Sequence, residues 1–277
     1  MEKRLKLPTL VGQQLRSHNL GIEPGKETNR IVSFIGEVVG RASGNGVVVA
    51  LSGGIDSAVV GALCVKALGS AKVLGLMLPS DHTPDEDKED AGALADSWGI
   101  RAESIPISKM VKSLIDSADV EGTKIARANV EARVRMVILY YYANALGYLV
   151  AGTGDRSESL LGYFTKGGDG QVDFLPVAHL YKTQVRALGA HLGLPRKIVE
   201  KPASPQLWPG QKASDEIPAE YDKLDVVLHY LFDLNSKPSE AASKGGVPMS
   251  VVEKVLEMHL KTGHKRSMPP SLARTSA

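Results

Sequence analysis

A short polar loop follows the apolar segment 47–51 and carries the residue types that bind an anion together with a cation. Residues 52–57 read Ser-Gly-Gly-Ile-Asp-Ser. Two adjacent glycines let a backbone approach an anion closely, and a helix that begins at the end of the loop presents unpaired N–H groups and a partial positive charge. Ser52 and Ser57 add hydroxyl donors. Asp56 repels a phosphate unless it holds a cation, so we interpret this carboxylate as a magnesium ligand.

This loop differs from two common phosphate-binding loops. No Gly-Lys-Ser or Gly-Lys-Thr follows it, and no third glycine is placed as in a dinucleotide-binding fingerprint. The structural alternative is a tight strand-to-helix turn in which Asp56 and Ser57 only cap the helix. The loop alone leaves both interpretations open.

Two more charged residues are candidates for the same chemistry. Glu158 lies just past the apolar segment 148–151, and carboxyl ends of parallel strands meet at one edge of a sheet. Asp56 and Glu158 are therefore a candidate magnesium pair, although a helix-start carboxylate explains Glu158 equally well. Lys182 begins a predicted helix, where the helix dipole disfavours a cation, and this position favours a phosphate contact.

Other basic residues lie in segments typical of binding. Lys166 lies in the glycine-rich loop 162–170, and loops of this kind usually carry function. Arg133 lies at the border of the apolar face of a predicted helix, where a guanidinium reaches a carboxylate or phosphate, or is simply solvated. His264 and Lys265 follow a helix end, where matching of charge to the helix dipole is a sufficient explanation.

The predicted elements alternate as in an α/β protein. Buried parallel strands are predicted at 47–51, 73–78, 104–107 and 148–151, and three of these segments are near-continuous apolar runs. Helices are predicted at 29–39, 57–68, 85–98, 123–146, 181–192, 219–232 and 247–262. This order favours a doubly wound parallel sheet flanked by helices, Rossmann-like or flavodoxin-like. The Pro-rich segment 201–218 is neither helix nor central strand.

Composition limits the class of protein. The 277 residues carry 43% hydrophobic and 23% charged side chains and a net charge of +2, which is too balanced for a nucleic-acid-coating protein. One cysteine excludes a disulfide framework and suits a reducing cytoplasm, and no apolar run is long enough to span a membrane. We expect a cytoplasmic protein with one domain over 1–277, a flexible segment at about 1–10 and a frayed tail at about 270–277.

The motifs together resemble a known family. The 52–57 loop is similar to the pyrophosphate-binding loop of the ATP pyrophosphatase superfamily, whose fold is adenine nucleotide alpha hydrolase-like. Segments 129–136, 152–158, 162–170 and 264–266 resemble those of ammonia-dependent NAD synthetase in order and spacing. The resemblance implies a homodimer that uses ATP, Mg²⁺, ammonia and deamido-NAD to make NAD, AMP and pyrophosphate.

The resemblance also implies roles for individual residues. It places Mg²⁺ on Asp56 and Glu158. It places ATP on Ala50, Leu51, Ser52, Gly53, Gly54, Ile55, Asp56, Ser57, Thr153, Lys182 and Ser204. It places deamido-NAD on Arg133, Lys166, Asp173, His264 and Lys265. Two departures stand out: Gly154-Asp155 replaces the Asp-His of many bacterial members, and Ile55 replaces a Gln.

The expected mechanism needs no protein nucleophile. The carboxylate of deamido-NAD attacks the α-phosphate of ATP, and ammonia then displaces AMP, with Asp56, Glu158 and Lys182 neutralising charge. Asp173 is the predicted acceptor of the proton that ammonium loses. Segments 81–88 and 202–216 are predicted lids that exclude water. Alternatives are another adenylating ligase of the superfamily, such as a tRNA-thiolating enzyme or GMP synthetase core, and a nucleotide sensor without turnover.

Overall fold

A parallel sheet of four strands forms the centre of the protein. The computed structural model describes residue 18 and residues 20–204, 207–208, 210–211 and 213–272. The strands are β1 (Gly46–Ala50), β2 (Val73–Met77), β3 (Arg101–Ser104) and β4 (Tyr148–Ala151), in the order β3-β2-β1-β4. All three strand pairs are parallel. The chain steps outward from β1 to β3 and then crosses to β4, so the direction of winding switches between β1 and β4.

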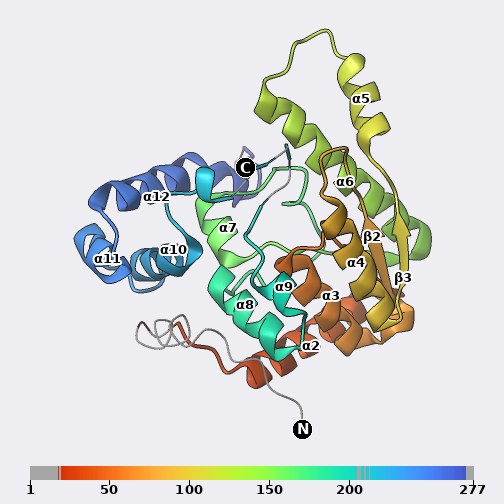
Figure 1. Cartoon of the computed structure of the whole chain (residues 1–277), viewed down its shortest axis with the longest axis horizontal. Helices are drawn as coiled ribbons and strands as arrows, with labels where there is room; N and C mark the ends of the chain where they lie inside the picture. Colours follow the sequence, from red (N-terminus) through yellow and green to blue (C-terminus); the bar gives the residue numbers. More distant parts are fainter. Residues whose placement is uncertain (1–17, 19, 205–206, 209, 212, 273–277) are drawn as a thin grey trace, which may run out of the picture.

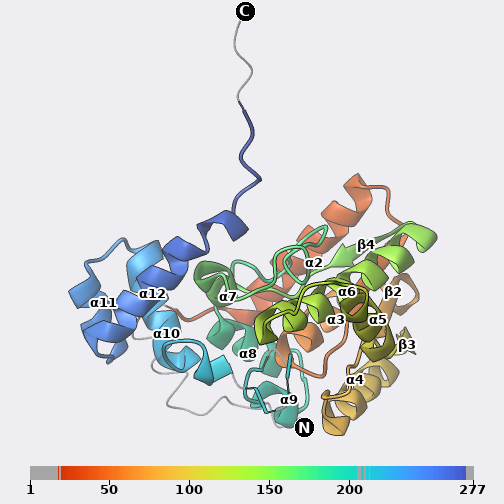
Figure 2. The same cartoon turned by 90° about the horizontal axis from the view of Figure 1, so that it is seen from above.

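Helices cover both faces of the sheet (Figures 1 and 2). One face packs against α2 (Pro24–Arg41), α3 (Ile55–Leu68), α4 (Asp85–Trp98) and α8 (Lys182–His191). The other face packs against α5 (Ser108–Asp116) and α6 (Lys124–Leu146). This arrangement confirms the predicted doubly wound α/β fold.

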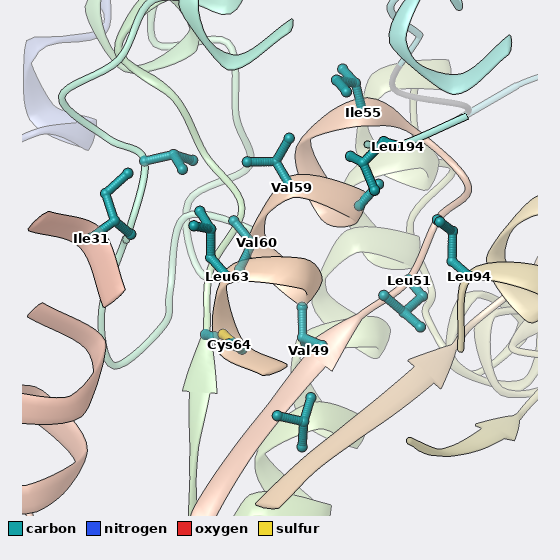
Figure 3. Packing of buried hydrophobic residues seen from close by; sticks show 14 of the residues in the cluster. Ile31, Val49, Leu51, Ile55, Val59, Val60, Leu63, Cys64, Leu94 and Leu194 are labelled. Atoms are coloured by element: carbon teal, nitrogen blue, oxygen red, sulfur yellow. The ribbon is translucent and has the colours of Figure 1, made fainter. Parts of the chain in front are cut away.

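Alternation along β1 divides the core between the two faces. Val47 and Val49 belong to the cluster under α2, α3 and α8, whereas Val48 belongs to the cluster under α5 and α6. Figure 3 shows Val49 and Leu51 beneath the helix that carries Val59 and Leu63. Strands with both faces covered are fully apolar, which explains the continuous runs in the sequence.

The C-terminal helices form a third hydrophobic cluster beside the sheet. It contains α7 (Arg156–Leu161), α10 (Tyr221–Leu228), a π-helical turn (His229–Asp233), α11 (Pro238–Gly245) and α12 (Met249–Lys261). Figures 1 and 2 both show α10, α11 and α12 together at one side of the molecule. The remaining short elements are α9 (Arg196–Val199) and 3₁₀ turns at Ser70–Lys72, Ala213–Asp215 and Gly263–Lys265.

Several predicted bounds were wrong. The strand predicted at 104–107 lies at Arg101–Ser104, because these residues pair with β2. Beyond them, the Ile105 N–H makes a single bond to the last residue of β2, and the Ile107 N–H bonds to Pro79, outside that strand. The segment 219–232 is α10 followed by a π-helical turn. The helices α5, α7, α9 and α11 were not predicted, because each is shorter than the window of about 11 residues over which a helical period is read.

The predictions about the two ends of the chain fall largely on residues that the structure does not describe. The flexible segment 1–10 and most of the 270–277 tail lie outside the described residues. None of the described helices is long and apolar enough to cross a membrane.

Candidate active site

Hydrogen bonds within the loop after β1 fix its conformation. The Ser57 Oγ accepts from the Ser52 N–H at 3.2 Å and donates to the Gly54 carbonyl at 3.0 Å. Gly53 has a φ of +76°, a left-handed conformation that favours glycine. Gly54 is the N-cap of α3 and no side chain caps this helix end, so the capping interpretation of Asp56 and Ser57 is wrong. The first turn of α3 therefore leaves N–H groups available to an anion.

A buried ion cluster lies beside this loop. The Lys182 Nζ lies 2.7 Å from Asp56 Oδ2, 2.8 Å from Glu158 Oε1 and 3.0 Å from Asp155 Oδ2. Lys182 is fully buried, and the three acids come from the first turn of α3 and the start of α7. We call these four residues the Lys182 cage.

The cage carries more negative than positive charge. Burial raises the pKa of Glu158 to about 8 and that of Asp155 to about 6, although Lys182 opposes both shifts. Burial lowers the pKa of Lys182, but the three carboxylates outweigh it and hold this pKa well above its usual value. A further cation beside Asp56 and Glu158 would offset the repulsion among the three carboxylates and favour their ionised forms.

Asp225 positions the two helices that supply the cage. This fully buried carboxylate accepts from Ser157 Oγ at 2.6 Å in α7. It also accepts from the backbone N–H of Thr183 at 2.9 Å and from Thr183 Oγ1 at 2.7 Å in α8. Asp225 thus fixes the starts of α7 and α8 relative to each other, next to Glu158 and Lys182.

A cavity of about 500 Å³ opens onto the loop and the cage. This volume lies within the range of small-molecule sites. The cavity lies at the carboxyl ends of β1 and β4, where the winding of the sheet switches. Predicted ATP residues that line it are Ala50, Leu51, Ser52, Gly54, Ile55, Asp56, Ser57, Thr153, Lys182 and Ser204. Gly53 is not among the lining residues, because its backbone packs against Asp87.

The residues present fit a divalent cation. Asp56 Oδ1 is buried and has no hydrogen-bond partner, while its other oxygen pairs with Lys182. Asp56 and Glu158 both line the cavity. No group of three His, Cys, Asp or Glu side chains suited to a metal occurs in the described part of the chain. The two cavity-lining carboxylates, Asp56 and Glu158, fit a cation such as Mg²⁺, which is commonly held by one or two carboxylates together with substrate phosphates and water.

The predicted dinucleotide residues form a connected group, with one exception. Arg133 donates from Nε and Nη2 to the Lys166 carbonyl at 3.3 and 3.2 Å, and Lys166 Nζ donates to the His264 carbonyl at 3.2 Å. Lys265 donates to the carbonyls of Gly162 and Phe164 and lines the cavity. Burial lowers the pKa of Lys265.

Asp173 lies apart from this group. It is exposed, accepts from Tyr140 Oη at 3.2 Å and from the Val150 N–H at 2.7 Å, and does not line the cavity. The role of proton acceptor therefore has no support from this placement.

Both predicted lids border the cavity. Asp87 and Lys88 line it from one side, and Lys201, Ser204 and Trp208 line it from the other. The Lys201 Nζ joins the two sides, at 2.6 Å from Asp87 Oδ1 and 2.5 Å from the buried Asp90. Residues 205–206, 209 and 212 lie outside the described residues, and the mobility of both segments stays a prediction.

Comparison with known proteins shows the family to which the chain belongs. The family model for NAD synthase matches residues 27–269. The chain belongs to the NAD synthase family.

Relatives of known name agree with this membership. The NH(3)-dependent NAD(+) synthetase of Hyperthermus butylicus is 50% identical over 242 residues, which cover 87% of this chain and 88% of that protein. The protein of the same name from Staphylothermus marinus is 46% identical over 253 residues, covering 91% and 92%.

Solved structures of the family share the fold. The NMN synthetase of Francisella tularensis has a TM-score of 0.81 and 32% identity, covering 92% of this chain and 100% of that one. The NH3-dependent NAD synthetase of Campylobacter jejuni has a TM-score of 0.78 and 30% identity, covering 91% and 100%. The predicted family resemblance is therefore confirmed.

Sequence reasoning missed several residues of the site. Asp155 was noted only as a departure from bacterial members, yet it completes the Lys182 cage. Arg135, Gln211 and Glu216 also line the cavity but were given no role, although Arg135 lies in segment 129–136 and the other two in the predicted lid 202–216. The signals available for Asp155 were its place in segment 152–158 and its position after β4, facing the switch in winding.

Proposed function

We propose that this chain catalyses the ATP-dependent amidation of deamido-NAD by ammonia, forming NAD, AMP and pyrophosphate. The observation that carries this proposal is the pyrophosphate-type loop opening with the Lys182 cage onto one cavity, in a chain of the NAD synthase family. Relatives named NH(3)-dependent NAD(+) synthetase support ammonia as the nitrogen donor. The protein is on this proposal a ligase that forms a carbon–nitrogen bond.

The reaction proceeds in two displacements. In the first, a carboxylate oxygen of deamido-NAD attacks the α-phosphorus of ATP, and pyrophosphate leaves. In the second, the nitrogen of ammonia attacks the carbonyl carbon of the adenylated acid, the C–O bond to AMP breaks, and the nitrogen loses a proton. No covalent bond to the protein forms, so the enzyme acts by positioning its substrates and stabilising charge.

Each part of the site contributes to the first displacement. The N–H groups at the start of α3 and the hydroxyls of Ser52 and Ser57 receive the departing pyrophosphate. Lys182 lies where it donates to phosphate oxygens once its carboxylates turn away. Asp56 and Glu158 would hold Mg²⁺, which supplies Lewis-acid stabilisation of phosphate charge when bound.

The substrate dinucleotide extends from the cavity toward Arg133, Lys166 and His264. Lys265 is the member of this group that lines the cavity. Two carbonyl acceptors hold its ammonium there, so the cation is available to a phosphate at the cavity wall. We assign these four residues to the binding of deamido-NAD.

A product assay tests the proposed function. Purified protein with ATP, Mg²⁺, deamido-NAD and ammonium chloride should release pyrophosphate and form NAD in equal amounts. Omission of deamido-NAD or of ammonium should stop both, and glutamine should not replace ammonium. Nicotinate mononucleotide serves as the control acceptor, because a structural neighbour is an NMN synthetase. Preference for that control acceptor, or ATP binding without turnover, would refute the proposal.

We also propose that the chain is a homodimer through the exposed side of α6. Val137 and Tyr141 lie four residues apart on this helix and are 61% and 72% exposed. Isologous pairing buries such a self-complementary apolar patch. Light scattering should give twice the chain mass, and Tyr141→Asp should give a monomer. The matched control Leu260→Asp changes an equally exposed residue on α12, on the other side of the molecule, and should stay dimeric (Figures 1 and 2).

A cytoplasmic location is the last part of the proposal. It rests on the single cysteine, a usage that suits a reducing compartment.

A further inference from the structure

Three carboxylates share the Lys182 ammonium, but only two of them reach the cavity. Asp56 and Glu158 line the cavity, and their side chains are 23% and 24% exposed. Asp155 does not line it, and its side chain has no exposed surface. The three acids are therefore not equivalent: a bound cation has access to two of them and not to the third.

Both oxygens of Asp155 lie against protein groups. Its Oδ1 accepts from the backbone N–H of Glu158 at 2.8 Å, which caps α7, and its Oδ2 lies 3.0 Å from Lys182 Nζ. Oδ2 of Asp155 and Oδ1 of Asp56 are both buried and make no hydrogen bond. Glu158 Oε2 in turn accepts a hydrogen bond from the Asp155 backbone N–H at 3.3 Å. The difference between them is access: Asp56 can direct its oxygen to a cation in the cavity, whereas Oδ2 of Asp155 faces Lys182.

We propose that the Lys182 ammonium, in a stand-in role, occupies the place of the divalent cation until the cation binds to Asp56 and Glu158. Asp155 is then the positioning residue: it keeps its ion pair with Lys182 when Asp56 and Glu158 turn to the metal. A buried ammonium that loses all its carboxylates is strongly disfavoured. Without Asp155, Lys182 competes with the metal for its only remaining acids. With Asp155, the lysine keeps an anionic partner and its Nζ is free to donate to phosphate. This inference rests on the proposed metal role of Asp56 and Glu158.

The variant Asp155→Asn isolates the charge. Asparagine is as good an N-cap as aspartate, so the start of α7 is kept while the negative charge facing Lys182 is removed. Mn²⁺ binding without nucleotide, followed by the electron paramagnetic resonance of free Mn²⁺, should weaken by about 10- to 100-fold, as for other supporting partners of metal ligands. The control Asp90→Asn removes an equally buried carboxylate that pairs with Lys197 and Lys201, and should leave Mn²⁺ binding unchanged.

A double-variant cycle shows whether Asp155 acts through Lys182. Lys182→Met removes the competing cation, so Mn²⁺ should bind at least as tightly as to the wild type. In that background Asp155→Asn should change the affinity by less than about threefold, because its partner is gone. A similar loss in both backgrounds, or weaker Mn²⁺ binding by Lys182→Met alone, would overturn the inference. If Asp155→Asn alone does not fold, Lys182→Met by itself still tests the stand-in role, because weaker Mn²⁺ binding by that variant would overturn it.

The failure of this inference is separable from that of the proposed function. Wild-type protein that forms NAD but binds no Mn²⁺ without nucleotide would overturn the stand-in role alone. Protein that binds Mn²⁺ as expected but forms no NAD would overturn the proposed reaction alone.

Discussion

Replacing Gly53 by alanine tests the tight packing that positions the phosphate loop. Gly53 has a φ of +76°, and an added Cβ would lie 2.3 Å from the carbonyl oxygen of Asp87 in the first turn of α4. The left-handed conformation costs about 1–2 kcal/mol for alanine, and overpacking adds about 1–3 kcal/mol. The free energy of unfolding should therefore fall by about 2–5 kcal/mol, and Tm by about 2–4 °C for each kcal/mol.

The alternative to this strain is movement of the loop. Separating the two atoms to an ordinary contact distance requires a shift of about 1 Å. A shift of this size in a catalytic loop lowers turnover by about 100-fold. For Gly53→Ala, calorimetric scanning should show a fall in Tm, titration with Mg-ATP should show a loss of nucleotide affinity, or both should occur.

Gly54→Ala is the matched control. Gly54 has a φ of −90°, and a Cβ there meets only the Ser52 Oγ at 3.3 Å, at the end of a side chain that can rotate. This variant should keep its Tm within about 2 °C, corresponding to less than about 1 kcal/mol. Equal behaviour of the two alanine variants, or wild-type stability and nucleotide affinity in Gly53→Ala, would refute the packing argument.

Two other buried groups give further predictions. Burial raises the pKa of Asp225 to about 6, so the folded state keeps a proton that the unfolded state loses above its ordinary value of 3.8. Stability should therefore fall as pH rises from about 4 to 6, by on the order of 3 kcal/mol from this group, and urea unfolding of Asp225→Asn should lack that part of the slope. Burial also raises the pKa of the Cys64 thiol to about 12, so a thiol reagent should label it only after denaturation. Rapid labelling of native protein would contradict the buried position that Figure 3 shows.

The sequence was sufficient for features that depend on local pattern. Continuous apolar runs such as 47–51 indicate a strand that is buried on both faces of the sheet. The Ser-Gly-Gly sequence indicates a turn that needs a residue in the left-handed conformation. The order of strands and helices then indicates that the loops after β1 and β4 meet at one edge of a sheet. Asp56 and Glu158 were found in this way. The polar strand β3 was misplaced because its signal comes from pairing with β2 and not from its own residues.

Only the tertiary structure decided which charged side chains face one another. The sequence indicated a phosphate contact for Lys182 from its place at a helix start, but not that it is fully buried between three acids. That placement depends on Asp225, which joins α7 to α8 from a helix late in the chain. Sequence alone indicated the family and predicted the loop at 52–57, because the motifs that carry both are local in the chain. The cage required the fold, because its energy comes from charges that only the packing of α3, α7 and α8 brings within 3.0 Å.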